Sequence, residues 1–137
     1  MAKQKITLEY EMNTMLSILY KRVATPEGLA SWFAEDAASE DGVVFSFLWH
    51  KDVSRAIVID SVPNEMIRFR WEDEDTDDYF EFRIVQPEMS RSIILCVTDF
   101  SEEEELEDVI QLWNFQIANL KRILADRKST RLNSSHT

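Results

Sequence analysis

Two hydrophobic periods organise the first third of the chain. Apolar and polar residues alternate over 5–12, which predicts a strand with one buried face. The pattern then changes to helical spacing over 15–23, with Asn13 or Thr14 placed to cap the helix. Thr25 precedes Pro26, and a capping hydroxyl followed by proline predicts the start of a second, short helix. We therefore expect a strand and two short helices before the turn at Asp41-Gly42.

The middle of the chain reads as a series of short strands. Residues 43–50, 55–62, 66–72, 79–84 and 92–100 are apolar or alternating runs, and turn signals such as Pro63-Asn64 separate them. The acidic segment 72–78 reads as a hairpin tip. Strands in series with turns between them indicate an antiparallel meander.

The last element has the clearest pattern. Ser101 followed by three glutamates reads as a capping box, and acidic residues are favoured at the start of a helix. Apolar residues then recur at helical spacing and form one stripe: Leu106, Val109, Ile110, Trp113, Ile117, Leu120 and Leu124. A helix over 102–124 would be long enough to cross a whole sheet. The predicted fold is α+β, of the helix-grip type: a curved antiparallel sheet with two short helices and a long C-terminal helix packed across it.

Composition narrows the classes of partner. The 137 residues fit one domain, and a 45% hydrophobic content supplies a core. A net charge of −11 argues against nucleic acids and anionic membranes, whose binding depends on clustered lysines and arginines. Small neutral or cationic molecules, or a basic protein surface, fit this charge. One cysteine, no signal-like leader and no long apolar run predict a cytoplasmic protein without disulfides or a membrane span.

The end of the chain does not read as native. Residues 126–136, DRKSTRLNSSH, resemble the translation of a common short-read sequencing adapter and have no apolar period. An ordinary frayed tail is the alternative. We interpret 1–125 as the domain and 126–137 as a non-native tail, which is left out of functional reasoning. Genomic sequence that continues differently past the codon for Leu124 would confirm this.

Several segments resemble one known family. Leu29-Ala-Ser-Trp32-Phe33-Ala34 resembles the L-x-x-W-F-A signature of START-like (SRPBCC) proteins, in the branch near the heat-shock-chaperone ATPase activator homologues. Residues 67–71 and 79–82 resemble the central strands of that family, and Asp99-Phe100 with 112–121 resembles its closing region. The resemblance covers about residues 5–125. It implies a cavity between sheet and long helix, but it implies no particular reaction.

Aromatic residues are the main candidates for a binding site. Several share the inward face of neighbouring strands, where rings would offer an apolar ligand a large and rigid contact area. The alternative is that they fill the core, because protein interiors pack densely. The candidate cavity residues are Trp32, Phe45, Phe47, Trp49, Phe69, Trp71, Phe80, Phe82, Trp113 and Ile117.

No catalytic group, metal site or cofactor is predicted. His50 stands alone at a strand end without a recognisable partner for general-base chemistry, and Cys96 lies in an apolar strand. The acidic segment 72–78 lacks the glycine of a calcium loop. Charged residues on paired strands are explained by cross-strand ion pairs, although one turned inward would orient a ligand.

These observations support three hypotheses. The first is a non-enzymatic START-like module that holds a small apolar ligand between the sheet and the C-terminal helix. The second is a protein-interaction or co-chaperone-like module that uses the acidic surface. The third is a cyclase- or hydratase-like enzyme, which would need an inward-facing acid or base with a perturbed pKa. Phe115, with Leu112 and Ile123 beside the apolar stripe, leaves room for a homodimer or partner patch.

Overall fold

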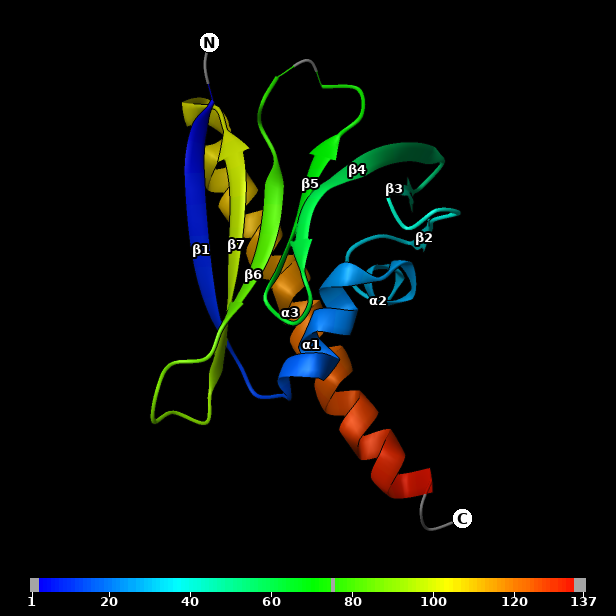
Figure 1. Ribbon diagram of the computed structural model, residues 1–137, viewed down its shortest axis with the longest axis vertical. Coiled ribbons are helices and arrows are strands. Elements are labelled where there is room, and N and C mark those ends of the chain that lie inside the picture. The colour runs from blue at the N-terminus through cyan, green and yellow to red at the C-terminus, as the bar shows by residue number, and fades with distance from the viewer. Residues whose placement is uncertain (1–2, 75, 135–137) are drawn as a thin grey trace.

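A curved antiparallel sheet forms the body of the protein. The computed structural model describes residues 3–74 and 76–134, with side chains as far as Asp126 (Figure 1). Within this range, seven strands pair in the order β1-β7-β6-β5-β4-β3-β2, all antiparallel. The strands are β1 (Gln4–Met12), β2 (Asp36–Ala38), β3 (Val44–Trp49), β4 (Asp52–Val62), β5 (Met66–Trp71), β6 (Phe80–Val85) and β7 (Ile93–Ser101). The predicted meander is confirmed, and β1 completes the sheet beside β7.

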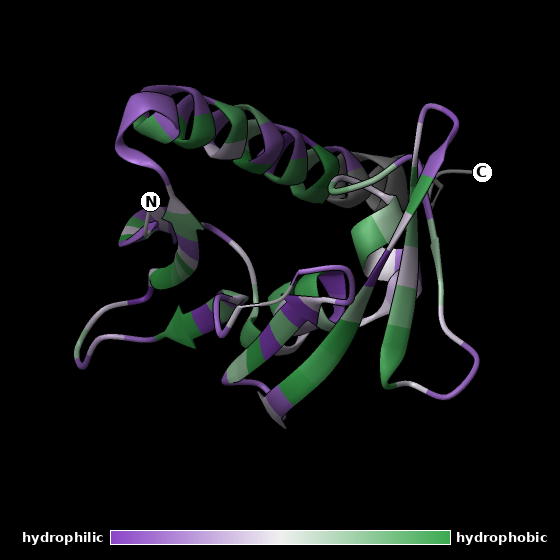
Figure 2. Ribbon diagram, turned by 90° about the horizontal axis from the view of Figure 1, so that it is seen from above, coloured by the Kyte–Doolittle hydropathy of each residue, from purple (hydrophilic) through white to green (hydrophobic). Residues whose placement is uncertain are grey.

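Helices cover one face of the sheet. Helices α1 (Leu16–Ala24) and α2 (Pro26–Ala30) follow β1, and the long helix α3 (Leu106–Ser134) follows β7 through a short 3-10 turn, η1 (Glu103–Glu105). Figure 2 shows α3 as a rod lying across the face of the curved sheet that we call the inner face. The Tyr10 hydroxyl donates to Asn114 Oδ1 at 2.7 Å and joins α3 to β1. The predicted α+β helix-grip fold is confirmed.

The ends of the first two helices correct one prediction and confirm another. Helix α1 starts after Met15, and no side chain caps it, so Asn13 and Thr14 do not play the expected role. Helix α2 starts as predicted: the Thr25 hydroxyl accepts a 3.0 Å hydrogen bond from the Gly28 N–H, and Pro26 follows the cap.

The start of the last helix was predicted wrongly. Ser101 remains the last residue of β7, paired with Gln4, and its hydroxyl donates to the Glu102 carbonyl at 2.9 Å. Since this serine is held in the sheet, the helix cannot begin there, and α3 begins only at Leu106. The helix also continues beyond residue 124 to Ser134. The adapter origin of the tail stays a prediction, and residues 135–137 lie outside the described residues.

An aromatic cluster packs between the sheet and Trp113 of α3. Phe47, Phe69, Phe80 and Phe82 are fully buried on the inner face of β3, β5 and β6. Phe69 stacks on Phe80 with ring centroids 5.0 Å apart. Phe82 also meets Trp113 of α3 edge-on at 5.7 Å. Rings from three strands and one helix therefore interlock, and this packing fixes the position of α3 over the sheet.

Candidate functional site

A cavity lies between the first half of α3 and the inner face of the sheet. Its volume is about 390 Å³, and β3, β5, β7, α3 and the segment after α2 contribute to its walls. Small-molecule sites in proteins typically have about 300–1,000 Å³. The lining residues are Phe33, Trp49, Trp71, Asp99, Val109, Leu112, Trp113 and Gln116.

Four of the eight lining residues are aromatic. Trp49 and Trp71 meet edge-on with centroids 5.9 Å apart. Phe33 lies 5.3 Å from the Trp49 ring and stacks on Trp113 at 5.9 Å. Each ring is therefore held by another ring of the same wall, so the cavity is lined by large side chains with restricted rotamers.

Hydrogen bonds within the protein fix the orientation of the indole rings of Trp49 and Trp113. The carbonyl oxygen of Phe33 accepts from Trp49 Nε1 at 3.0 Å and from Gln116 Nε2 at 3.2 Å. The Trp113 Nε1–H donates to Asp99 Oδ2 at 2.9 Å. These two tryptophan N–H groups are thus used within the protein, and the rings offer their apolar surfaces to the cavity.

Asp99 is the one ionisable side chain among the eight described residues that line the cavity. Its Oδ1 accepts from the Phe100 backbone N–H at 2.8 Å, and its Oδ2 accepts from Trp113. Burial raises the pKa of Asp99, while the hydrogen bonds from Trp113 and Phe100 act in the opposite direction. The charge of Lys3 also lowers this pKa, and that of Glu74 raises it. The site is an apolar cavity with one carboxyl group in its wall.

Three of the ten candidate residues line the cavity, and the other seven are buried in the hydrophobic core. Trp49, Trp71 and Trp113 line the cavity. Trp32 is buried and donates its Nε1–H to the Arg22 carbonyl at 2.8 Å. The other six are buried in the hydrophobic core: Phe45, Phe47, Phe69, Phe80, Phe82 and Ile117. Core filling and cavity lining, which we weighed as alternatives, therefore both occur, and ligand contact by the three tryptophans stays a prediction.

Sequence reasoning missed five lining residues as cavity candidates. Phe33 and Asp99 lay in segments that carry the family resemblance, and Val109 and Leu112 lay in or beside the apolar stripe. Alternation along β7 would have identified Asp99, because it lies on the same face of the strand as the buried Leu95 and Val97. Gln116 also lay in the segment 112–121 that carries the family resemblance, but it is polar and stands outside the apolar stripe.

Charged residues of the paired strands β5 and β6 pack on the outer face of the sheet. Arg68 of β5 pairs with the buried Glu81 of β6 at 2.7 Å, and Arg83 approaches the same carboxylate at 3.2 Å. The Arg68 guanidinium also lies 4.3 Å from the Tyr79 ring centroid. The predicted cross-strand ion pair is confirmed, and among the cavity-lining residues the charged group that turns inward is Asp99.

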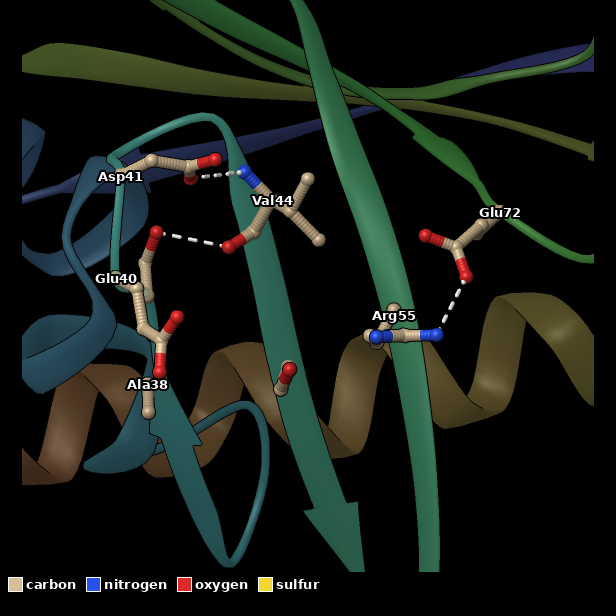
Figure 3. Close-up of a pocket in the computed structure, with 8 residues that line it drawn as sticks. Ala38, Glu40, Asp41, Val44, Arg55 and Glu72 are labelled. Carbon is tan, nitrogen blue, oxygen red and sulfur yellow. Dashed lines mark hydrogen bonds and ion pairs between the residues drawn. The ribbon is translucent and has the colours of Figure 1, made fainter.

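A second cavity, of about 400 Å³, is polar and lies on the outer face. Figure 3 shows its residues on β2, the loop before β3, β3, β4 and the segment after β5, with α3 behind the strands. Asp41 Oδ1 accepts from the Val44 N–H at 2.9 Å, Ser39 donates to the Val44 carbonyl at 2.8 Å, and Arg55 pairs with Glu72 at 3.0 Å. These polar groups bind one another, so the aromatic cavity is the stronger candidate site.

Two further observations concern the part of the chain that the structure describes. No three histidine, cysteine or acidic side chains there are placed to hold a metal ion. No helix there is both long enough and apolar enough to span a membrane. His50 is exposed, and Cys96 is half-buried with a pKa raised mainly by burial.

Two of three comparisons place the chain among known proteins. Residues 1–126 match the profile of the START-like superfamily domain. The solution structure of the Bacteroides fragilis protein BfR322 is 35% identical, with a TM-score of 0.66, over 90% of this chain and 92% of that one. None of the functionally curated proteins matches.

More distant structures share the fold. The Aha1 dimer from Colwellia psychrerythraea is 14% identical, with a TM-score of 0.75, over 88% of this chain and 96% of that one. DynU16, a protein of the dynemicin biosynthetic locus, is 16% identical, with a TM-score of 0.75, over 88% of this chain and 47% of that one. The profile match over nearly the whole chain agrees with the helix-grip architecture and confirms the predicted family: the protein belongs to the START-like superfamily.

Proposed function

We propose that the protein binds a small apolar ligand in the cavity under α3 and does not transform it. The observation that carries the proposal is the wall of Phe33, Trp49, Trp71 and Trp113 around about 390 Å³ of space. Rings that are already fixed lose little entropy when a ligand arrives, so burial of apolar surface contributes directly to affinity.

Binding is favoured over catalysis by the chemistry of the wall. General acid–base reactions need a positioned proton donor or acceptor together with a second group that activates the substrate. Asp99 is surrounded in the wall by rings and aliphatic side chains, with the Gln116 amide already bonded to the Phe33 carbonyl. One carboxyl in such a wall suits recognition of a polar end of the ligand.

Quenching of tryptophan fluorescence tests the proposal directly, because three of the four tryptophans line the cavity. A panel of naphthalene-sized aromatics, a fatty acid and a sterol should include probes that quench saturably. Trp71→Leu removes part of the wall and should weaken binding at least about tenfold. Phe115→Ala removes a ring on α3 that is 65% exposed and does not line the cavity, so this variant should bind as the wild type does. Absence of saturable binding by every probe would overturn the proposal.

A further inference from the structure

Aromatic rings and a carboxyl group line the same cavity. Trp49, Trp71 and Trp113 contribute the rings, and Asp99 contributes the carboxyl group, which accepts a hydrogen bond from Trp113. Ring faces carry negative electrostatic potential and attract cations, tryptophan most strongly. A carboxylate and several ring faces around one small volume therefore give that volume a negative electrostatic potential.

We infer that the cavity selects ligands with a protonated amine or quaternary ammonium group, which the tryptophan faces and the Asp99 carboxylate hold together. The inference rests on the proposed function and names the class of ligand. It distinguishes this site from one built for a fatty acid, whose carboxylate would meet a like charge at Asp99.

The charges around Asp99 leave room for such a partner. The two hydrogen bonds it accepts come from neutral N–H groups, those of Trp113 and Phe100. No lysine or arginine is among the eight described lining residues. Lys3 and Glu74 act on Asp99 with opposite signs. A bound cation would supply the close counter-charge that the carboxylate lacks, and this agrees with the direction in which burial moves its pKa.

The start of α3 does not oppose a cation. A helix N-terminus carries a partial positive charge, and Val109 of the cavity wall lies in the first turns of α3. Glu107 and Asp108 stand in the first turn, and the glutamates of η1 precede it. These carboxylates offset the helix dipole, and the net charge of −11 favours the approach of cations from solution.

The test uses two probes of the same shape. Benzyltrimethylammonium is a cation, and neopentylbenzene is its uncharged carbon isostere. Both are titrated into the full chain with tryptophan fluorescence as the readout. The wild-type protein should bind the cation at least about tenfold more tightly than the isostere. Equal or tighter binding of the isostere would overturn the inference but leave the proposed function intact. Failure of both probes and of the apolar panel would overturn both.

Asp99→Asn is the matched variant. The asparagine side-chain oxygen can still accept from the Trp113 N–H, but the charge is gone. The affinity for the cation should fall about tenfold or more, and the affinity for the isostere should persist. Glu9→Gln, which removes one charge from an exposed position of β1, should change both affinities less than twofold. An unchanged ratio of the two affinities in Asp99→Asn would overturn the inference.

A pH series on the wild-type protein needs no variant. Protonation of Asp99 removes the charge that attracts the cation, so affinity for benzyltrimethylammonium should fall as the pH is lowered through the pKa of this group. The affinity for neopentylbenzene should stay constant over the same range, which separates the loss of the Asp99 charge from a general loss of stability. Parallel loss of both probes, or loss of neither, would count against the assignment.

Discussion

The Trp113 indole N–H donates a 2.9 Å hydrogen bond to Asp99 Oδ2 and joins α3 to β7. The same two side chains line the cavity. The bond therefore has two consequences: it positions the long helix over β7, and it fixes both the carboxyl group and one ring of the candidate site. Removal of either partner should change stability and the site together.

Trp113→Phe keeps an aromatic ring but removes the donor. We expect a loss of about 1–3 kcal/mol in the free energy of unfolding, because a partly buried carboxyl loses a hydrogen bond. The pKa of Asp99 should also rise further, since this bond is the largest of the effects that lower it. Urea denaturation and carbon-13 NMR titration of the carboxyl measure the two effects.

Trp32→Phe is the control for this variant. The Trp32 Nε1–H also bonds within the protein, to the Arg22 carbonyl at 2.8 Å, but Trp32 does not line the cavity. The control should lose stability without moving the titration of Asp99. A Trp113→Phe protein with an unchanged Asp99 titration would show that the bond does not influence the carboxyl.

Asp99→Asn should change the pH dependence of stability. Because burial raises the pKa of Asp99 in the folded state, its protonated form favours folding. This contribution is fully present below the unfolded pKa and is lost as the pH rises through the folded pKa. Asparagine stays neutral at every pH, so the stability of the variant relative to that of the wild type should rise as the pH increases from the acidic range to neutrality. Its NH2 group cannot accept the hydrogen bond from the Phe100 N–H, which adds a loss of stability that does not depend on pH.

The difference between the two proteins isolates this one group from the many other acidic residues. Urea denaturation in steps across the acidic range and at pH 7 gives the two stability curves, with Asp108→Asn as the exposed-charge control. A variant that is less stable than the wild type by a constant amount at every pH would contradict the raised pKa.

Two neighbours on β5 should differ in their contribution to stability. Phe69 is fully buried within the ring cluster, whereas Trp71 borders the cavity. Phe69→Ala should lower the free energy of unfolding by about 3–5 kcal/mol. Trp71→Ala should cost less, although it removes more atoms, because the side of the ring that faces the cavity has no packed neighbours to lose. Chemical denaturation of both variants measures the difference, and a larger loss for Trp71→Ala would show that the Trp71 ring is packed at least as fully as that of Phe69.

The elements were predictable where the information is local. Alternation in β3 and the apolar stripe of α3 depend on side chains within one element, and both predictions held. The three-residue β2 was not predicted, since Asp36–Ala38 has little alternation and is a strand because it pairs with β3. The helix start at Ser101 failed for the same reason: pairing with Gln4, far away in the sequence, holds this residue in the sheet.

The site was predictable only in part, because the division between core and cavity is tertiary. Phe47 and Trp49 stand two residues apart on the same strand face, yet the first is fully buried and the second lines the cavity. What differs is the position of each ring relative to α3 and to Phe33, which stacks on Trp113. The periodicity of a sequence carries no information on the distance between two packed layers.

The close approach of α1 and α2 gives the last prediction. Gly28 is buried in α2, and a Cβ atom there would overlap the carbonyl oxygen of Lys21 and lie 2.6 Å from the Arg22 Cα. Both neighbours are backbone atoms, so Gly28→Ala must push the two helices apart. We expect a loss of about 1–3 kcal/mol in the free energy of unfolding. Since Phe33 follows α2 and forms part of the cavity wall, ligand affinity should fall as well.

Gly42→Ala provides the control at the other glycine. Gly42 has a φ of +76° and open space around its Cα, so alanine there is strained without any clash. This substitution should cost about 1–2 kcal/mol through backbone conformation alone and leave ligand affinity unchanged, because the turn before β3 lies outside the aromatic cavity. Chemical denaturation and fluorescence titration of both variants separate the two mechanisms. Wild-type affinity in Gly28→Ala would show that the helix pair does not position Phe33.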